Sequence, residues 1–119
     1  MTHGAFVFRN EGDGCLTVKF MHDQNGGPFT ECCVLKDRLK DRSLEIGSDS
    51  FLGEYTCTWI DGTRKHLGNG TLTIKKQPTN VALYELTWVT ANSQLLFTGT
   101  GMLFEKLLVG TYWEPTVSE

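Results

Sequence analysis

The sequence has no excess of charge of either sign and no long apolar run. Its 119 residues include 11 basic and 14 acidic side chains, for a net charge of -3. The chain therefore lacks the excess of basic residues that would attract nucleic acid or an anionic membrane. No stretch approaches the roughly 18 consecutive apolar residues needed to span a bilayer, and Met1–Arg9 lacks the basic start and apolar run of a signal peptide. We therefore expect a soluble cytoplasmic protein without nucleic-acid or membrane partners.

Recognisable metal-binding and phosphate-binding motifs are also missing. The histidines and cysteines show neither Cys-x-x-Cys nor His-x-His spacing, and the adjacent Cys32 and Cys33 project to opposite faces of a strand, so they cannot chelate one ion. Without a secretion signal, reduced, buried and inert thiols are expected. The glycine-rich segments open no helix and lack the Gly-Lys-Ser/Thr ending of a phosphate loop. We expect no metal and no cofactor. The residues considered are His3, His22, His66, Cys15, Cys32, Cys33 and Cys57.

One short pattern, with Tyr, Thr and Trp at its first, fourth and fifth positions, occurs twice in the sequence, as Tyr55-Thr56-Cys57-Thr58-Trp59 and as Tyr84-Glu85-Leu86-Thr87-Trp88. Alternate residues of a strand share a face, so each copy has one aromatic face, expected to be buried, and one face of threonine and glutamate. A glycine-spaced strand follows each copy. The repeat therefore predicts two related β-hairpins.

The rest of the chain also alternates with a period of two, and segments rich in turn residues separate the strands. One alternative stays open: the charged Lys36–Arg42 is either a short helical turn or a solvated hairpin end. Asn69-Gly70-Thr71 fits a glycosylation sequon and a tight hairpin turn, and the turn is favoured. The expected strands are 4–10, 15–20, 29–35, 43–47, 54–61, 70–76, 83–90, 94–105 and 106–114.

Strands that recur every 8 to 15 residues predict an all-β fold. We expect a single domain over residues 1–119, an antiparallel meander of about eight or nine strands. A sandwich is possible, but a closed or nearly closed barrel is favoured. Inward glycines at Gly99, Gly101 and Gly110 would make room for rings, bend the strands or leave space for a ligand, and the first two readings are preferred.

The length, the meander and two segments, Gly53-Glu54-Tyr55 and Gly110-Thr111-Tyr112-Trp113, resemble the small up-and-down barrels of the avidin and lipocalin group. The resemblance covers about the last 65 residues of the chain. It implies a barrel and the binding of a small molecule. It assigns no binding residue.

The face of the third strand decides the position of Glu31. If the Phe29 side faces inward, Glu31 is drawn into the interior and becomes a proton acceptor with a raised pKa. A rim or outward position is the favoured alternative for a glutamate.

These patterns lead to three hypotheses for function. The first is a barrel that binds a small hydrophobic or aromatic molecule between aromatic rings. The second is an assembly module whose interior is filled by those same rings. The third is an enzyme that uses the cavity, with Glu31 or His66 as acid or base. The interior candidates are Tyr55, Trp59, Tyr84, Trp88, Tyr112 and Glu31, with Arg64 and His66 at the mouth.

Both faces of the last hairpin are apolar, which is unexpected for a sheet with one face in water. Exposed apolar patches often mark interfaces, and identical subunits pair most simply about a two-fold axis. We therefore expect a homodimer through this region. The residues expected at the interface are Leu95, Leu96, Leu107, Val109 and Trp113.

Overall fold

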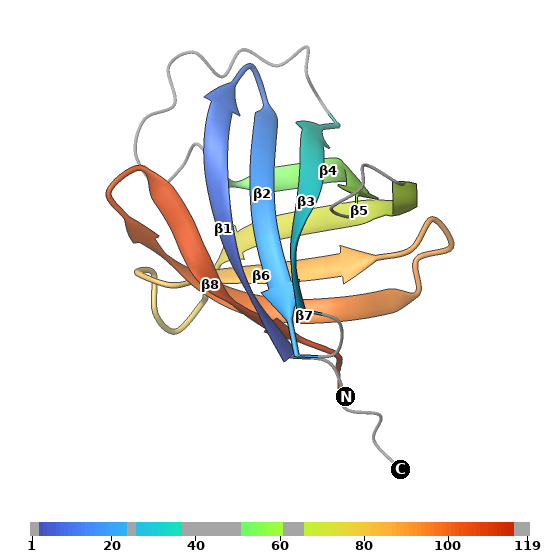
Figure 1. The fold of residues 1–119 in the computed structure, drawn as a ribbon. Coiled ribbons are helices and arrows are strands. Elements are labelled where there is room, and N and C mark those ends of the chain that lie inside the picture. Colours follow the sequence, from blue (N-terminus) through green and yellow to red (C-terminus); the bar gives the residue numbers. More distant parts are fainter. Residues whose placement is uncertain (1–2, 24–25, 37–50, 61–65, 116–119) are drawn as a thin grey trace.

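The structure, a computed structural model, describes residues 3–23, 26–36, 51–60 and 66–115. Within these ranges eight antiparallel strands follow one another around a closed barrel (Figure 1). The predicted all-β meander and its closure are confirmed. The strands are β1 (His3–Gly12), β2 (Cys15–His22), β3 (Gly26–Leu35), β4 (Gly53–Ile60), β5 (His66–Lys76), β6 (Tyr84–Val89), β7 (Leu95–Phe104) and β8 (Leu107–Trp113).

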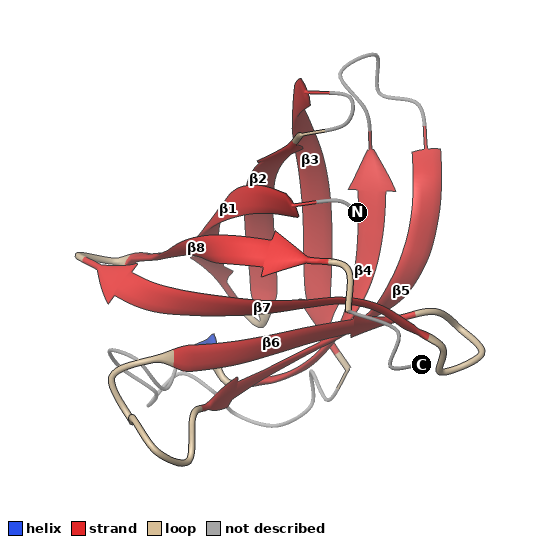
Figure 2. Cartoon of the chain, turned by 90° about the horizontal axis from the view of Figure 1, so that it is seen from below, coloured by secondary structure: helices blue, strands red, loops and turns tan. Residues whose placement is uncertain are grey.

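Pairing of the first strand with the last closes the barrel. The β1–β8 ladder runs from His3 opposite Trp113 to Arg9 opposite Leu107. In Figure 1, β1, β2 and β3 run steeply across β4 to β7, and Figure 2 shows the same strands from below. Every described strand has two neighbours, so closure leaves no free sheet edge in this part of the chain. Within the described ranges, no helix has the length and hydropathy to cross a bilayer.

The expected turn between the first two strands lies where the sequence places it. At the β1–β2 turn, Gly12, Asp13 and Gly14 all have positive φ angles, of 92°, 54° and 76°. At the β7–β8 turn, Glu105 has a φ of 57°. This left-handed region is open to glycine and is adopted more rarely by other residues.

One predicted turn is wrong. Gly68, Asn69 and Gly70 lie inside β5, opposite Trp59, Thr58 and Cys57 of β4. Gly68 and Gly70 both lie against the ring of Trp59, and the chain continues through them as a strand. The expected strand at 43–47 and the charged segment from residue 37 to residue 42 lie outside the described residues.

The core lies inside the barrel, on the face that the alternation predicts. Burial follows the period of two, as in β6, where Tyr84, Leu86 and Trp88 are buried while Glu85 is exposed. The core residues are Phe6, Phe8, Leu16, Val18, Cys33, Leu35, Phe51, Tyr55, Cys57, Leu72, Ile74, Tyr84, Leu86, Trp88, Leu108 and Tyr112.

The inward glycines make room for aromatic rings. A Cβ on Gly70 would come within 2.8 Å of Cη2 of Trp59, and a Cβ on Gly110 within 2.9 Å of Cζ of Phe6. Both separations are shorter than carbon atoms tolerate. The backbone carbonyl oxygens of Val89 and Thr100 would lie closer still to the Cβ atoms on Gly70 and Gly110, respectively. Rings and neighbouring backbone together therefore occupy the space beside these two glycines.

The two ends of the barrel differ. At the end where β4 starts, the side chains of Tyr55, Ile74 and Leu108 are at most 1% exposed. The Tyr55 hydroxyl donates to the carbonyl oxygen of Phe51 at 3.0 Å, and Phe51 is itself buried. At the end where β4 finishes, Trp59 is only partly buried. We call the first the sealed end and the second the aromatic end.

Candidate functional site

A buried carboxyl group lies inside the barrel, on β3. Glu31 is 2% exposed, so the favoured expectation of a rim or outward position is wrong and the inward alternative is correct. Its neighbours in register are Val18 of β2 and Trp59 of β4. From β6, the Nε1–H of Trp88 donates to Oε2 of Glu31 at 3.0 Å. The residue therefore joins strands on opposite parts of the barrel wall.

Burial changes the acid strength of this group. Removal from water disfavours the charged form and raises the pKa of Glu31 to about 7. Hydrogen bonds from the indoles of Trp88 and Trp59 and from the thiols of Cys57 and Cys33 act in the opposite direction. The carboxyl group is thus surrounded by donors, yet it changes protonation state near neutral pH.

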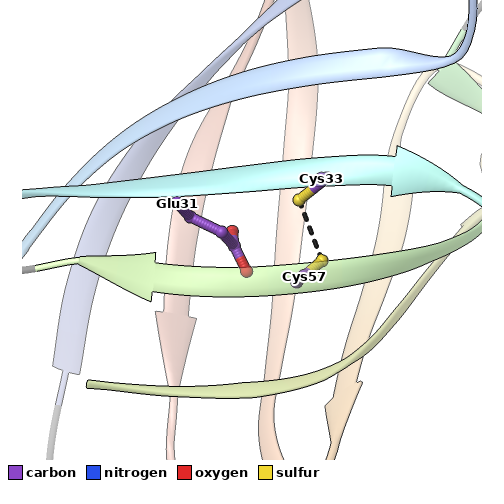
Figure 3. Close-up of side chains that lie close together, drawn as sticks. All are labelled: Glu31, Cys33 and Cys57. Carbon is purple, nitrogen blue, oxygen red and sulfur yellow. Dashed lines mark hydrogen bonds between the residues drawn. The ribbon is translucent and has the colours of Figure 1, made fainter. Parts of the chain in front are cut away.

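Two cysteines lie beside the carboxyl group (Figure 3). Cys33 of β3 is directly opposite Cys57 of β4, and their sulfur atoms are 2.8 Å apart. Both residues are buried, whereas Cys32 is exposed on the outer face, which confirms that Cys32 and Cys33 point in opposite directions. Burial raises the pKa of both buried thiols, well above the ordinary value for Cys33. Cys32, which is exposed, and Cys15, which is only partly buried, depart from the expected burial of all thiols.

Several aromatic rings pack against one another at the aromatic end, and one of them, Trp88, contacts Glu31. The centroid of Tyr112 lies 5.3 Å from that of Phe97, 5.9 Å from that of Trp88 and 6.2 Å from that of Phe20. These are the separations of favourable ring pairs. The set, named the aromatic ring set, consists of Phe20, Phe29, Trp59, Trp88, Phe97 and Tyr112.

The candidates named from the sequence divide between the two ends. Trp59, Trp88 and Tyr112 join Glu31 at the aromatic end, while Tyr55 and Tyr84 lie at the sealed end. His66 begins β5 opposite Ile60. Its side chain and the whole of Arg64 lie outside the described part of the chain.

The tyrosine hydroxyls have different surroundings. The Tyr112 hydroxyl donates to the carbonyl oxygen of Met21 at 3.3 Å, and burial raises the pKa of Tyr112 to about 12. The Tyr84 hydroxyl is buried and has no hydrogen-bond partner among the described residues. A buried polar group of this kind calls for a water molecule or a ligand atom.

Sequence reasoning missed several contributors. Phe20, Phe29 and Phe97 are absent from the predicted site residues, although each shares the inward alternation of its strand. The pairing of Cys33 with Cys57 depends on the β3–β4 register, for which the sequence carries no local signal.

Comparison with known proteins leaves this site to be interpreted from its own geometry. No protein-family model, curated protein or solved structure matches the chain. The structure itself shows a closed eight-stranded antiparallel barrel with a buried carboxyl group and two buried thiols.

The buried carboxyl group predicts a pH-dependent stability. In metal-free protein, Glu31 binds its proton more tightly when folded (pKa about 7) than when unfolded (about 4.5). Its contribution to stability is therefore full below pH 4.5 and is lost as the pH rises to about 7. Glu31→Gln should not show this loss. As the pH rises across that range, the free energy of unfolding of the variant should therefore increase by on the order of 3 kcal/mol relative to that of the wild type. Urea unfolding as a function of pH measures it.

The matched control is Glu85→Gln, which changes an exposed glutamate on β6. It should retain the pH dependence of the wild type. Equal slopes for wild type and Glu31→Gln between these pH values would contradict the burial of an ionisable carboxyl group.

Proposed function

We propose that the protein binds a small aromatic or hydrophobic molecule at the aromatic end of the barrel. The observation that carries the proposal is the arrangement of Glu31 beneath the aromatic ring set, with Trp88 bonded to one of its oxygens. Ligand sites in proteins are mostly apolar and contain a few polar groups that fix orientation. A flat apolar ligand that stacks on the partly buried rings matches this chemistry.

The difference between the two ends supports the choice of location. At the sealed end the large side chains of Tyr55, Ile74 and Leu108 are buried, and the carbonyl oxygen of Phe51 accepts a hydrogen bond from the Tyr55 hydroxyl. Leu52 and Leu103, the partly buried apolar residues at this end, are aliphatic. At the aromatic end, Phe20, Trp59 and Phe97 are only partly buried. Partly buried rings leave apolar surface that a flat ligand would cover.

The resemblance of the chain to avidin-like and lipocalin-like barrels points the same way. In small barrels of eight strands the interior holds side chains or one small ligand. Here the rings already fill the space beside the glycines, so the ligand belongs above the rings, toward the aromatic end.

A fluorescent probe tests this proposal. N-phenylnaphthylamine is neutral, flat and apolar, and it has one N–H group. We expect saturable binding of one probe per chain, seen as increased probe fluorescence. Trp59→Ala removes a partly buried ring and should weaken binding about tenfold, the effect of losing about 1.4 kcal/mol of stacking.

Trp113→Ala is the matched control, because Trp113 lies on the outer face of β8, opposite Thr98. This variant should bind the probe as the wild type does. Absence of saturable binding, or an equal loss in the two variants, would contradict a site at the aromatic end.

A second candidate function is self-association through the outer face of β7 and β8. Met102 and Phe104 are 54% and 62% exposed. Across the sheet, Met102 lies opposite Val109, and Val109 lies opposite Val7 of β1. An apolar row therefore crosses three strands, which is the kind of surface that partners cover. It continues into a shallow groove of about 270 Å³ lined by Ala5, Phe6, Val7, Lys19, Phe20, Met21 and Pro28.

This face contains part of the expected dimer interface. Leu107 and Val109 lie on it, Trp113 lies on the outer face of β8, and Leu95 is 46% exposed. Leu96 packs partly against the core. We propose a second copy of the chain as the partner, since an outer face used by both copies satisfies two-fold symmetry.

Light scattering coupled to size-exclusion chromatography tests the dimer. Wild type should elute as a dimer at micromolar concentration, and Phe104→Asp should be monomeric because it places a charge in the apolar contact. Val81→Asp, which changes a 72% exposed residue outside this face, should remain dimeric. A monomeric wild type at all concentrations would contradict the proposal.

A further inference from the structure

Three side chains inside the barrel bring metal-binding atoms together. The carboxyl group of Glu31 and the sulfur atoms of Cys33 and Cys57 all lie within 4.8 Å of one another. Glu31 and Cys33 are two residues apart on β3, so both face inward, and the β3–β4 register places Cys57 directly opposite Cys33. Figure 3 shows the carboxyl group and the two sulfur atoms in the space between the strands.

The ligand chemistry selects the class of ion. Thiolates favour soft or borderline cations such as Zn²⁺ and Cd²⁺. Ca²⁺ takes six to eight oxygen ligands and Mg²⁺ binds through oxygen, so the two sulfur atoms exclude both. Three protein ligands around a tetrahedral ion leave a fourth position for water or for a donor atom of another molecule.

The spacing of the sulfur atoms suits one shared ion. With Zn–S bonds of about 2.3 Å in a tetrahedron, two thiolates lie about 3.8 Å apart. The sulfur atoms are now 2.8 Å apart. Because Cβ atoms of directly opposed residues are about 4.5 to 5.5 Å apart, small rotations of the two side chains cover the difference without moving the strands.

A neighbouring residue already orients the carboxylate. Trp88 donates to Oε2 of Glu31, and the indole of Trp59 also donates to this carboxyl group. Ligating carboxylates are commonly held by such outer hydrogen bonds. Trp88 is therefore a positioning residue in this arrangement and does not contact the ion.

Binding of a divalent ion at these three side chains would leave the charge of the barrel interior unchanged. Above the pKa of Glu31 its carboxylate is ionised, and Cys33 and Cys57 are thiols. Binding of one divalent ion forms two metal–sulfur bonds and one metal–oxygen bond and releases the two thiol protons. The net charge of the three side chains and the ion is then -1, the same as before binding, so the interior gains no charge.

From this geometry we propose that Glu31, Cys33 and Cys57 bind one thiophilic divalent cation, of the Zn²⁺ and Cd²⁺ class, inside the barrel. The site goes beyond the proposed ligand site, although the two share Glu31. Variants separate them: Cys57→Ser should lose the metal and keep N-phenylnaphthylamine, and Phe97→Ala, which removes a partly buried ring of the aromatic ring set, should keep the metal and weaken the probe.

Cadmium titration of the full-length, reduced, metal-free protein tests the proposal. At a pH of about 8, above the pKa of Glu31, we expect one Cd²⁺ per chain. Thiolate-to-cadmium charge-transfer absorption should appear, and about two protons should be released, as a pH indicator in weak buffer would show. Cys33→Ser and Cys57→Ser should lose most of this absorption, and Trp88→Phe should weaken binding about 10- to 100-fold.

Cys32→Ser is the matched control, since Cys32 is exposed on the opposite face of the same strand. It should bind Cd²⁺ as the wild type does. Cadmium NMR of the wild type supports the site without relying on any variant, provided that the chemical shift reports two sulfur ligands. Oxygen-only coordination, an equal effect of Cys32→Ser and Cys33→Ser, or a Cys33–Cys57 disulfide that reductant does not open would each overturn the proposal.

Discussion

The interior of this barrel depends on how one buried carboxyl group is held. Burying an ionisable group is costly unless donors surround it. Glu31 receives hydrogen bonds from groups on three strands: from Cys33 on its own strand, from Trp59 and Cys57 on β4, and from Trp88 on β6. A slip of β3 by one residue would turn Glu31 outward and lose every one of these bonds. The polar cluster therefore favours a single register for β3.

Rings and glycines are the second constraint on the interior. Trp59 packs over Gly68 and Gly70, and Phe6 packs over Gly110. A barrel of eight strands has little spare room, so large rings require neighbours without side chains. This complementarity places apolar surface above the carboxyl group, and the combination is what makes the aromatic end a candidate ligand site.

Much of the fold could be predicted because period-two alternation is a local property. The buried face of Tyr84, Leu86 and Trp88 and the β1–β2 turn at Gly12, Asp13 and Gly14 are both visible in short windows of sequence. Asn69-Gly70 was misread as a turn because the same dipeptide serves hairpins and ring packing. Only the neighbouring strand, with Trp59 opposite Gly68, separates the two uses.

The site could be predicted less well, because it depends on contacts between distant residues. The sequence favours a rim or outward position for Glu31 over an inward one, since a lone glutamate favours water. Its donors lie up to 57 positions away in the sequence. Similarly, no spacing rule links Cys33 to Cys57. Their meeting follows from the β3–β4 register, which no local pattern encodes.

The most direct test of this account is the indole N–H of Trp88, observed by nitrogen–proton NMR in metal-free protein. We expect the Trp88 indole resonance to be protected from exchange and to shift with pH at a midpoint near 7, as Glu31 titrates. Glu31→Gln should abolish that shift. A Trp88 resonance that exchanges rapidly with water and does not respond to Glu31 would contradict the buried carboxyl–indole bond.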